Sequence, residues 1–310
     1  MTRENPLKLG TRGSPLAMAQ AQEVRDLLIA HHSQLAALGS IEIIEIKTTG
    51  DAVQDRALSE VGGKGLFSKE IDAAQLEGQI DIAVHSMKDL ETHLVPGIAL
   101  IAALQREDVR DAFISHKANS LAELPSGSVI GTSSLRRQSQ ILHKRPDLKV
   151  CLFRGNVQTR LRKLSEGVAD ATLLALAGLN RLGKSELATD IMAPEDLLPA
   201  VAQGAIGITC REGDDDTIAL VNALNHQPTM IRVSAERALL NALDGSCRTP
   251  VGGLAEFLED GRLWLRALVA KEDGSQVFET ERTGPASDGD AMGRDAGDEL
   301  RSRAGPNILS

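Results

Sequence analysis

With 310 residues, of which 42% are hydrophobic, the chain is long enough to form two or three domains with packed cores. The net charge of −9 argues against a general nucleic-acid binder, and three widely separated cysteines argue against a disulfide framework. The longest apolar runs fall well short of the ~20 residues that a membrane span needs, and the opening MTRENPLKLG lacks the apolar core of a signal peptide. We therefore expect a cytoplasmic protein that binds neither nucleic acid nor membrane.

The N-terminal part of the chain alternates between strand and helix patterns. LKLGT predicts a strand, and Ser14 followed by Pro15 predicts the start of a helix that we expect to run to about Leu38. IEIIEIKT predicts a second strand, the Gly-rich VGGKG leads into the helical segment LFSKEIDAAQLEG, and DIAVHS predicts a buried strand. This alternation is typical of an α/β sheet with helices on both faces.

A similar pattern follows a boundary that we place near residues 105–110. SVIGTSS, LKVCLF and DATLLALAGL predict strands, and the first two lead into helical segments that begin LRRQ and VQTR. Two α/β halves of similar size are therefore predicted. PAVAQGAIGITC supplies one more strand, which could belong to either half.

The last ninety or so residues change character. A helix is predicted over about 229–243, and two hairpin turns are predicted at Asp260-Gly261 and Asp273-Gly274. The acidic segment 288–299 predicts a closing helix. This part is expected to be an α+β unit built on a small antiparallel sheet.

The basic residues are concentrated in one segment. Between residues 136 and 163, nine Lys and Arg side chains accompany a single acid, Asp147, so this segment carries +8 and the remainder must carry −17 to reach the total of −9. A local basic site in an acidic protein indicates a small anionic ligand rather than a long polyanion.

Small polar residues and arginines follow three of the predicted strands, in TRGS, TSSLRR and RGNVQTR. Each motif stands where a helix begins, and helix N-termini attract anions, while arginine forks bind carboxylate or phosphate. Arg181, after AGLN, could add a fourth contributor. HSMKD follows the buried DIAVHS strand, at the end of a strand where ligands bind in open α/β sheets. VGGKG lacks the Ser or Thr that a phosphate loop places after its lysine, so we expect a mobile loop with Lys64 available to an anion.

The three cysteines differ in their surroundings. Cys151 and Cys210 lie within strand patterns and are expected in the core. Cys247 lies in the polar, Gly-flanked loop DGSCRTPVGG, where it could be incidental, a nucleophile or a covalent anchor, and its neighbours alone leave these alternatives open. A metal site is not predicted, because no second Cys or His lies at a ligand spacing. Pairing of Cys247 with His85 as in a cysteine protease has no local signature to support it.

Taken in order, the motifs TRGSPLA, GGKGLFSKE, DIAVHSMKD, REDVRDAF, GTSSLRRQ, RGNVQTRL, AGLNRLG, LPAVAQGAIGI and GSCRTP resemble those of the hydroxymethylbilane synthase (porphobilinogen deaminase) family over nearly the whole chain. The resemblance implies two doubly wound α/β lobes similar to type II periplasmic binding proteins, and a smaller C-terminal α+β domain. It implies a first lobe of residues 1–104 and 200–223, a second lobe of 105–199 and a C-terminal domain of 224–310.

The resemblance also implies the reaction. Four porphobilinogen units are joined head to tail with loss of ammonia, and the product is the linear tetrapyrrole hydroxymethylbilane of haem biosynthesis. The family's cofactor is a dipyrromethane, bound by a thioether to the loop cysteine, here Cys247. A monomer is expected.

Residue roles follow by carry-over from the same family. Asp89 is the expected catalytic carboxylate, stabilising the cationic azafulvene left when ammonia departs, and neighbouring Lys88 is expected to bind a substrate carboxylate. The other residues expected to bind cofactor or substrate are Arg12, Ser14, Lys64, Phe67, Ser86, Ser133, Ser134, Arg136, Arg137, Arg154, Gly155, Asn156, Arg160, Arg181 and Gln203.

The chain departs from the family pattern at a few positions. Glu60 replaces a lysine found in several relatives, Glu91 stands near a common proline, and Ala202 replaces a common glycine. Two other functions fit the sequence less well. A binding module without catalysis would leave Cys247 and the C-terminal part without a role, and a cysteine hydrolase lacks an identifiable base.

Overall fold

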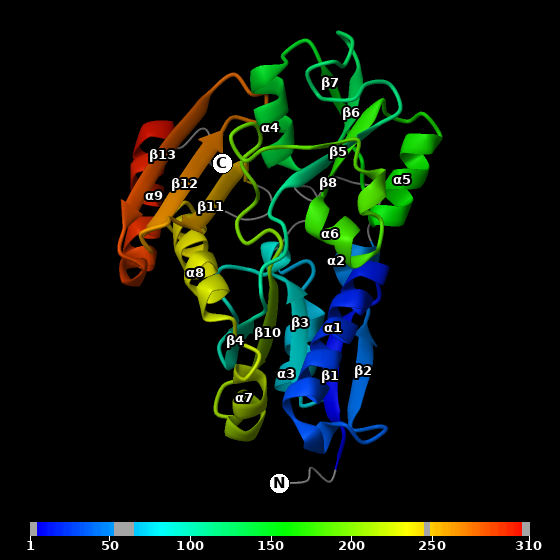
Figure 1. Cartoon of the computed structure of the whole chain (residues 1–310), viewed down its shortest axis with the longest axis vertical. Coiled ribbons are helices and arrows are strands. Elements are labelled where there is room, and N and C mark those ends of the chain that lie inside the picture. Colours follow the sequence, from blue (N-terminus) through cyan, green and yellow to red (C-terminus); the bar gives the residue numbers. More distant parts are fainter. Residues whose placement is uncertain (1–4, 53–64, 245–248, 306–310) are drawn as a thin grey trace. The chain divides into compact units, whose positions relative to one another are not determined.

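The computed structural model of the chain describes residues 5–52, 65–244 and 249–305. The chain divides into two compact units, whose elements are labelled in Figure 1. The first unit comprises residues 1–54, 63–107 and 205–230, and the second comprises residues 55–62, 108–204 and 231–310.

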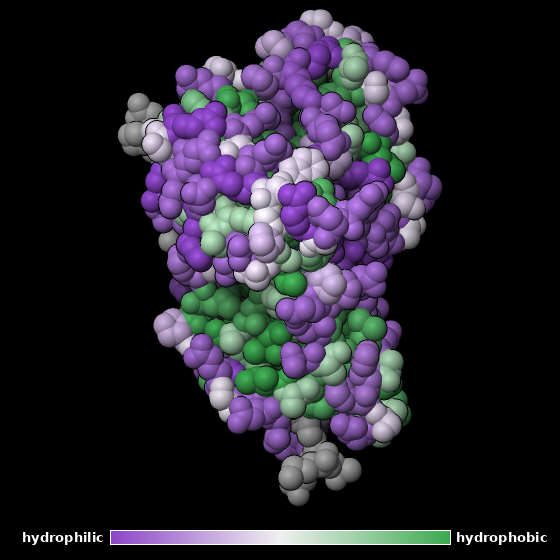
Figure 2. All heavy atoms as spheres, turned by 60° about the vertical axis from the view of Figure 1, so that its left-hand side comes forward, coloured by the Kyte–Doolittle hydropathy of each residue, from purple (hydrophilic) through white to green (hydrophobic). Residues whose placement is uncertain are grey.

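Hydrophobic and hydrophilic side chains are unevenly distributed on the face drawn in Figure 2. Hydrophobic side chains gather in the lower part of this view, and hydrophilic side chains dominate its upper part. None of the helices in the described ranges is both long enough and apolar enough to cross a membrane.

The first unit is built on a five-stranded sheet in the order β2-β1-β3-β10-β4. β1 pairs in parallel with β2 and β3, whereas β10 runs antiparallel to both β3 and β4. The segment PAVAQGAIGITC therefore contributes its strand to the first unit, a choice that the strand pattern alone left open. The strands are β1 (Leu7–Arg12), β2 (Ile41–Ile46), β3 (Ile82–Ser86), β4 (Ile98–Ala103) and β10 (Ile206–Arg211).

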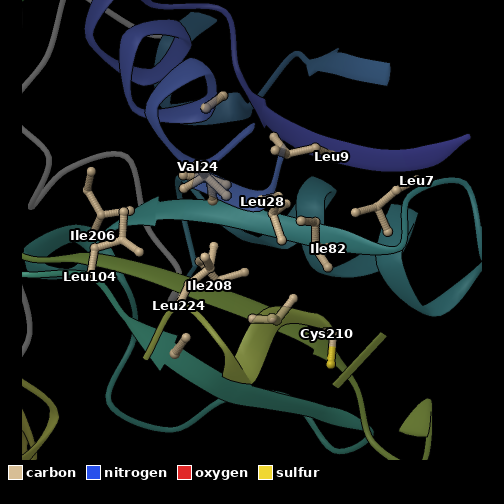
Figure 3. Packing of buried hydrophobic residues seen from close by; sticks show 14 of the residues in the cluster. Leu7, Leu9, Val24, Leu28, Ile82, Leu104, Ile206, Ile208, Cys210 and Leu224 are labelled. Atoms are coloured by element: carbon tan, nitrogen blue, oxygen red, sulfur yellow. The ribbon is translucent and has the colours of Figure 1, made fainter. Parts of the chain in front are cut away.

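Helices cover both faces of this sheet. Val24 and Leu28 of α1 (Pro15–His31) pack on one face with Ile82, in the cluster of Figure 3 that also includes residues of α7 (Asp215–Asn222) and the buried Cys210. Ile71 of α3 (Lys69–Leu76) packs instead with Ala83 on the other face. Successive strand residues point to opposite faces, so the two clusters lie on either side of the sheet. The short helices are α2 (Thr49–Ala52), η1 (Ser33–Leu35) and η2 (Met87–Asp89).

Helix α1 begins as predicted but ends earlier. The Ser14 hydroxyl accepts a hydrogen bond from the Ala17 amide at 3.3 Å, and Pro15 occupies the first helical position. The prediction that the helix continues to about Leu38 is wrong, because the backbone becomes extended at His32. The His32 ring donates from Nε2 to the Leu220 carbonyl at 2.8 Å, and Leu35 is buried in the core. These tertiary contacts outweigh the local helical preference.

The second unit contains a sheet of equivalent order, β7-β6-β8-β5-β9. β6 pairs in parallel with β7 and β8, and β5 runs antiparallel to β8 and β9, so in each large sheet four strands run in one direction and one runs antiparallel to them. The strands are β5 (Asp111–Ser115), β6 (Val129–Gly131), β7 (Lys149–Cys151), β8 (Ala171–Ala175) and β9 (Asp190–Ile191).

Helices again cover both faces. Ile141 of α4 (Leu135–Lys144) packs in one cluster with Phe113, whereas Leu164 of α5 (Val157–Ser165) packs in another with Ile114, the next residue of β5. Helix α6 (Leu176–Arg181) joins the α5 cluster through Leu179, and η3 (Ser185–Leu187) follows it. The predicted pair of α/β sheets, each covered on two sides, is confirmed. Cys151 is only partly buried in the α5 cluster, so its prediction as a core residue holds less fully than that of Cys210.

The C-terminal part forms the predicted antiparallel sheet. β11 (Val251–Phe257), β12 (Leu263–Ala270) and β13 (Val277–Gly284) pair in sequence, and Gly261 and Gly274 adopt positive φ in the two turns. The helices are α8 (Gln227–Ala242), η4 (Ala286–Asp288) and α9 (Gly289–Ala304). A Cβ at Gly293 of α9 would lie 2.2 Å from the Ala235 carbonyl of α8, so glycine permits this close helix contact.

Ala202 adopts a left-handed backbone conformation with φ of 59°. This conformation brings Cβ close to the following carbonyl, at a cost of roughly 1–2 kcal/mol for a residue other than glycine. The Ala202 amide donates to Oε2 of the fully buried Glu236 at 2.6 Å, and Oε1 of Glu236 accepts from the Ala255 amide of β11 at 2.8 Å. The buried carboxylate therefore holds this turn against β11.

We predict that Ala202→Gly is close to neutral for stability. Relief of the strained backbone offsets the lost methyl burial of about 0.8 kcal/mol and the added freedom of the unfolded chain. Ala205→Gly is the control, because Ala205 is equally buried but has no positive φ, and this change should lower the free energy of unfolding by about 1–2 kcal/mol. Urea denaturation measures both, and equal losses in the two variants would show that Ala202 carries no strain.

Candidate active site

The parallel strands β1 and β3 lie side by side, and their ends bring Arg12 close to Asp89. Arg12 is the last residue of β1, and Asp89 lies in η2, immediately after β3. The guanidinium NH1 lies 3.9 Å from Oδ2 of Asp89, and both side chains are partly exposed. This separation is longer than a hydrogen bond, so the two groups attract each other without forming a bidentate pair.

A pocket opens at these strand ends within the first unit. Five of the residues expected to bind ligand line it together, namely Arg12, Ser14, Phe67, Ser86 and Asp89. Lys88 is adjacent to Asp89 in η2 but does not belong to the pocket lining. The other lining residues are Leu16, Ala17, Gln20, Ser68, Ile71, Val84 and His85.

Packing holds Arg12 in place from one side. The guanidinium carbon lies 4.2 Å from the centroid of the Phe67 ring, within the range of a cation–π interaction. Phe67 in turn lies against Gly50, where a Cβ would come 2.4 Å from the ring. Phe67 therefore contributes to the site in two ways: it holds Arg12 in place, and it forms part of the pocket wall.

Gln20 is a pocket residue that we did not predict. It is buried on α1, and its Oε1 accepts a hydrogen bond from the Ser86 hydroxyl at 2.9 Å. The sequence feature that indicates Gln20 is its position as a glutamine on the buried side of an amphipathic helix. His85 is also buried, with Nε2 lying 3.1 Å from the Thr209 hydroxyl, and Thr209 donates to Oε1 of Gln75 at 3.0 Å. Since the threonine proton goes to Gln75, His85 must donate from Nε2.

Three residues of interest lie outside the described ranges: Glu60, Lys64 and Cys247. The chain next to Lys64 is anchored, because the Gly65 amide donates to Oε1 of Glu91 at 2.8 Å. Glu91, noted above as a departure from the family pattern, therefore binds the end of the VGGKG loop.

A second polar cluster forms in the other unit, where β6 leads into α4. Ser133 accepts from the Phe153 amide at 3.1 Å, and Ser134 caps α4 through a long contact of 3.5 Å to the Arg137 amide. Arg136 and Arg137 follow in the first turn of the helix, and each is only 4% exposed. Both were expected to face ligand, yet both are largely enclosed by protein.

Asp111, the first residue of β5, lies between the two arginines. Arg136 donates from NH2 to Oδ2 at 2.7 Å, and Arg137 donates from NH2 to Oδ1 at 2.7 Å and from Nε to Oδ2 at 3.2 Å. Gln203 Nε2 adds a fourth hydrogen bond to Oδ1 at 2.9 Å. Burial by itself would raise the pKa of Asp111, but the two guanidinium groups outweigh it and hold the pKa well below its ordinary value.

The RGN turn that follows β7 shows a related arrangement. Gly155 adopts φ of 122°, and Asn156 caps α5 by accepting from the Thr159 amide at 2.9 Å. Arg160 folds back so that its Nε donates to the Gly155 carbonyl at 2.9 Å, and Arg154 is 7% exposed. Arg181, at the end of α6, donates from NH1 to the Gly204 carbonyl at 3.2 Å.

The expected site residues therefore form two groups. Arg12, Ser14, Phe67, Ser86, Lys88 and Asp89 belong to the first unit, and the serines and arginines from Ser133 to Arg181 belong with Gln203 to the second. Three basic side chains of segment 136–163 form ion pairs with nearby acids and are less available to a ligand. These pairs are Arg145–Asp147, Arg162–Glu166 and Lys144–Asp196. Among the residues that the structure describes, no three His, Cys, Asp or Glu side chains gather as a metal site.

Comparisons with known proteins identify close relatives. The family model "Porphobilinogen deaminase, dipyromethane cofactor binding domain" matches residues 7–219, and "Porphobilinogen deaminase, C-terminal domain" matches 230–302. The chloroplastic porphobilinogen deaminase of Oryza sativa subsp. japonica is 59% identical, over 98% of this chain and 85% of its own. The porphobilinogen deaminase of Paracoccus denitrificans (strain Pd 1222) is 54% identical over 97% and 95%.

The solved structures that are similar to this chain share much less of its sequence. A periplasmic substrate-binding protein of an ABC transporter from Coxiella burnetii is 14% identical, covers 74% of this chain and 96% of its own, and gives a TM-score of 0.41. The methionine-binding protein MetQ is also 14% identical, covers 71% and 89%, and gives a TM-score of 0.44.

We predict that removing the two helix caps of the second unit lowers stability by unequal amounts. Asn156→Ala removes a cap of normal length and should lower the free energy of unfolding by about 1 kcal/mol. Ser134→Ala removes a contact at the limit of a hydrogen bond and should cost no more than about 0.5 kcal/mol. Chemical denaturation of the two variants measures the difference. A larger loss for Ser134→Ala would mean that its hydroxyl serves the helix rather than a ligand.

Proposed function

The chain belongs to the porphobilinogen deaminase family, and on this basis we propose a role for each polar group of the two clusters. The reaction of the family joins porphobilinogen units into the linear tetrapyrrole hydroxymethylbilane on a dipyrromethane cofactor, and it is the reaction of this chain. The substrate is porphobilinogen. What remains to be assigned is which residues bind it and which act on it.

The observation that carries the assignment is the meeting of Arg12 and Asp89 at the ends of β1 and β3. Loss of ammonia from the aminomethyl group of porphobilinogen leaves positive charge on the pyrrole ring. A carboxylate fixed beside that ring stabilises the developing cation, and it can hold the ring proton while the carbon–carbon bond forms. We assign these tasks to Asp89, and we assign a substrate carboxylate to Arg12.

The arginines of the second unit are proposed to bind the carboxylates of the cofactor and of the growing chain. Each pyrrole unit carries one acetate and one propionate, so every ring adds two negative charges. The cluster fits such groups, because Asp111 neutralises only one of the two buried guanidinium charges of Arg136 and Arg137. Nε of Arg136, although buried, donates to no atom in the part of the chain that the structure describes. A carboxylate is the natural partner for this surplus.

Cys247 is proposed as the thioether anchor of the dipyrromethane cofactor. When bound, the cofactor supplies the pyrrole end to which new units are added. On this proposal the Cys247 thiolate acts once, when the cofactor is attached, and Asp89 acts at every addition. Lys64 is proposed to contact substrate from the VGGKG loop. Gly155 and Asn156 are proposed to hold the RGN turn in shape for Arg154 and Arg160.

The remaining expectations stay predictions of the family resemblance. They are a monomeric, cytoplasmic enzyme without nucleic-acid or membrane partners, and the three-domain division at 1–104 with 200–223, 105–199 and 224–310. A binding module without catalysis is disfavoured by the family assignment.

The anchor predicts a change in intact mass. The purified chain should be heavier than its sequence by two pyrrole units, and Cys247→Ser should abolish this excess, because the hydroxyl is too weak a nucleophile to form the bond. Cys151→Ser is the matched control and should keep the excess. Mass spectrometry of the denatured protein gives the answer, and an excess retained in Cys247→Ser would place the anchor elsewhere.

The catalytic assignment predicts the behaviour of Asp89→Asn. This variant keeps the shape of the side chain but loses its charge, so kcat should fall at least ~100-fold while the cofactor mass remains detectable. Asp81→Asn is the control, since Asp81 precedes the same strand at its other end and pairs with Arg211 at 3.2 Å. It should lower stability and leave kcat close to that of the unmodified chain. Near-normal turnover in Asp89→Asn would exclude Asp89 as the catalytic carboxylate.

A further inference from the structure

Asp111 does more than neutralise charge in the arginine cluster. It is fully buried, and its two oxygens accept three hydrogen bonds from Arg136 and Arg137 and one from Gln203. Both oxygens bind at least one guanidinium N–H, so neither arginine can rotate without breaking a short, charge-assisted contact. This geometry therefore orients the two guanidinium groups as well as compensating their buried charge.

Backbone carbonyls complete the enclosure of the two arginines. Arg136 NH1 donates to the Leu198 carbonyl at 2.7 Å, and Arg137 NH1 donates to the Leu173 carbonyl at 2.9 Å. Each guanidinium is thus held at two points, by Asp111 and by one carbonyl from a separate segment. Arginine side chains otherwise carry about 2 kcal/mol of rotamer entropy, which a binding site must remove. Here folding of the second unit removes this rotamer entropy before any ligand binds.

The segment around Leu198 also contacts the strand that follows the cysteine loop. The Gly253 amide of β11 donates to the Pro199 carbonyl at 3.0 Å, and a Cβ at Gly252 would lie 3.2 Å from the Leu198 carbonyl oxygen. The carbonyl that binds Arg136 is therefore packed against β11. β11 begins at Val251, three residues after position 248, so the arginine pair is supported by a strand that is close in sequence to Cys247.

We propose that Asp111 is a positioning residue that fixes the guanidinium planes of Arg136 and Arg137, so that their remaining N–H groups meet a carboxylate of the cofactor. The proposal rests on the assignment of these arginines to cofactor carboxylates. Asp111 touches neither cofactor nor substrate and acts through the pair. Gln203, expected from the family to contact ligand, acts on this view through Asp111, because its amide binds Oδ1 of Asp111 and the Val109 carbonyl.

The decisive variant is Asp111→Asn, which keeps the shape of the side chain but replaces one acceptor by a donor facing the guanidinium groups. The measurement is the fraction of purified chain that carries the two-pyrrole mass excess, followed during incubation with porphobilinogen. Positioning predicts that loading slows about tenfold, the effect of losing ~1.4 kcal/mol of interaction. Circular dichroism at the same temperature establishes that the variant is folded.

Asp147→Asn is the matched control. Asp147 binds Arg145 through both oxygens at 2.8 Å at the opposite end of α4, so Asp147→Asn weakens a partly exposed Asp–Arg ion pair away from the cluster. Its loading should equal that of the unmodified chain. If Asp111→Asn does not fold, Gln203→Leu is the second variant, because it removes one hydrogen bond from Asp111 and leaves the arginines unchanged. Cofactor loading should then slow about threefold, since only part of the interaction that positions the arginines is lost.

The outcomes separate the two proposals. An unmodified chain without the mass excess would refute the anchored cofactor on which the inference depends. With the excess present, unchanged loading in folded Asp111→Asn or Gln203→Leu would overturn the positioning role. Faster loading in Asp111→Asn would also overturn it, because the greater positive charge would then matter more than the fixed geometry.

Discussion

Two guanidinium groups can be buried at the start of α4 only because the carboxylate of Asp111 lies between them. An isolated buried charge is costly, and a pair of like charges is costlier, whereas one carboxylate with four hydrogen bonds compensates much of that cost. The compensation is incomplete, since one positive charge remains. The second unit thus combines rigidity with a net attraction for anions, and its arginine-rich motif depends on an acid contributed by a different strand.

The two large sheets show why both clusters lie where they do. Each sheet has three adjacent parallel strands, and in each the polar motifs follow the ends of these strands. Parallel neighbours end at the same edge of a sheet, so residues distant in sequence become neighbours there. Arg12 and Asp89 meet in this way. The ends of β6 and β7 likewise bring Ser133 to the Phe153 amide.

Local signals predicted the elements well where local contacts decide them. The Ser14 cap, the Pro15 start and the two Asp-Gly turns each involve residues close in sequence, and all are found as expected. The end of α1 was missed because Leu220 and the core decide it, not the residues between His32 and Leu38. Ala202, noted only as a departure from a common glycine, has the positive φ for which glycine is normally required.

The sequence by itself determined the α/β class, the family, the reaction and the residue types of the anion sites. These features depend on hydrophobic periodicity and on motifs a few residues long, both of which are visible in a single chain. Only the tertiary structure decided that Arg136 and Arg137 are buried and that Asp111, itself bonded to Gln203, holds them. These contacts join residues 25 to 92 positions apart, as in the bonds of Arg136 and Gln203 to Asp111. No local pattern specifies such pairs, because chain topology and packing choose among many possible partners.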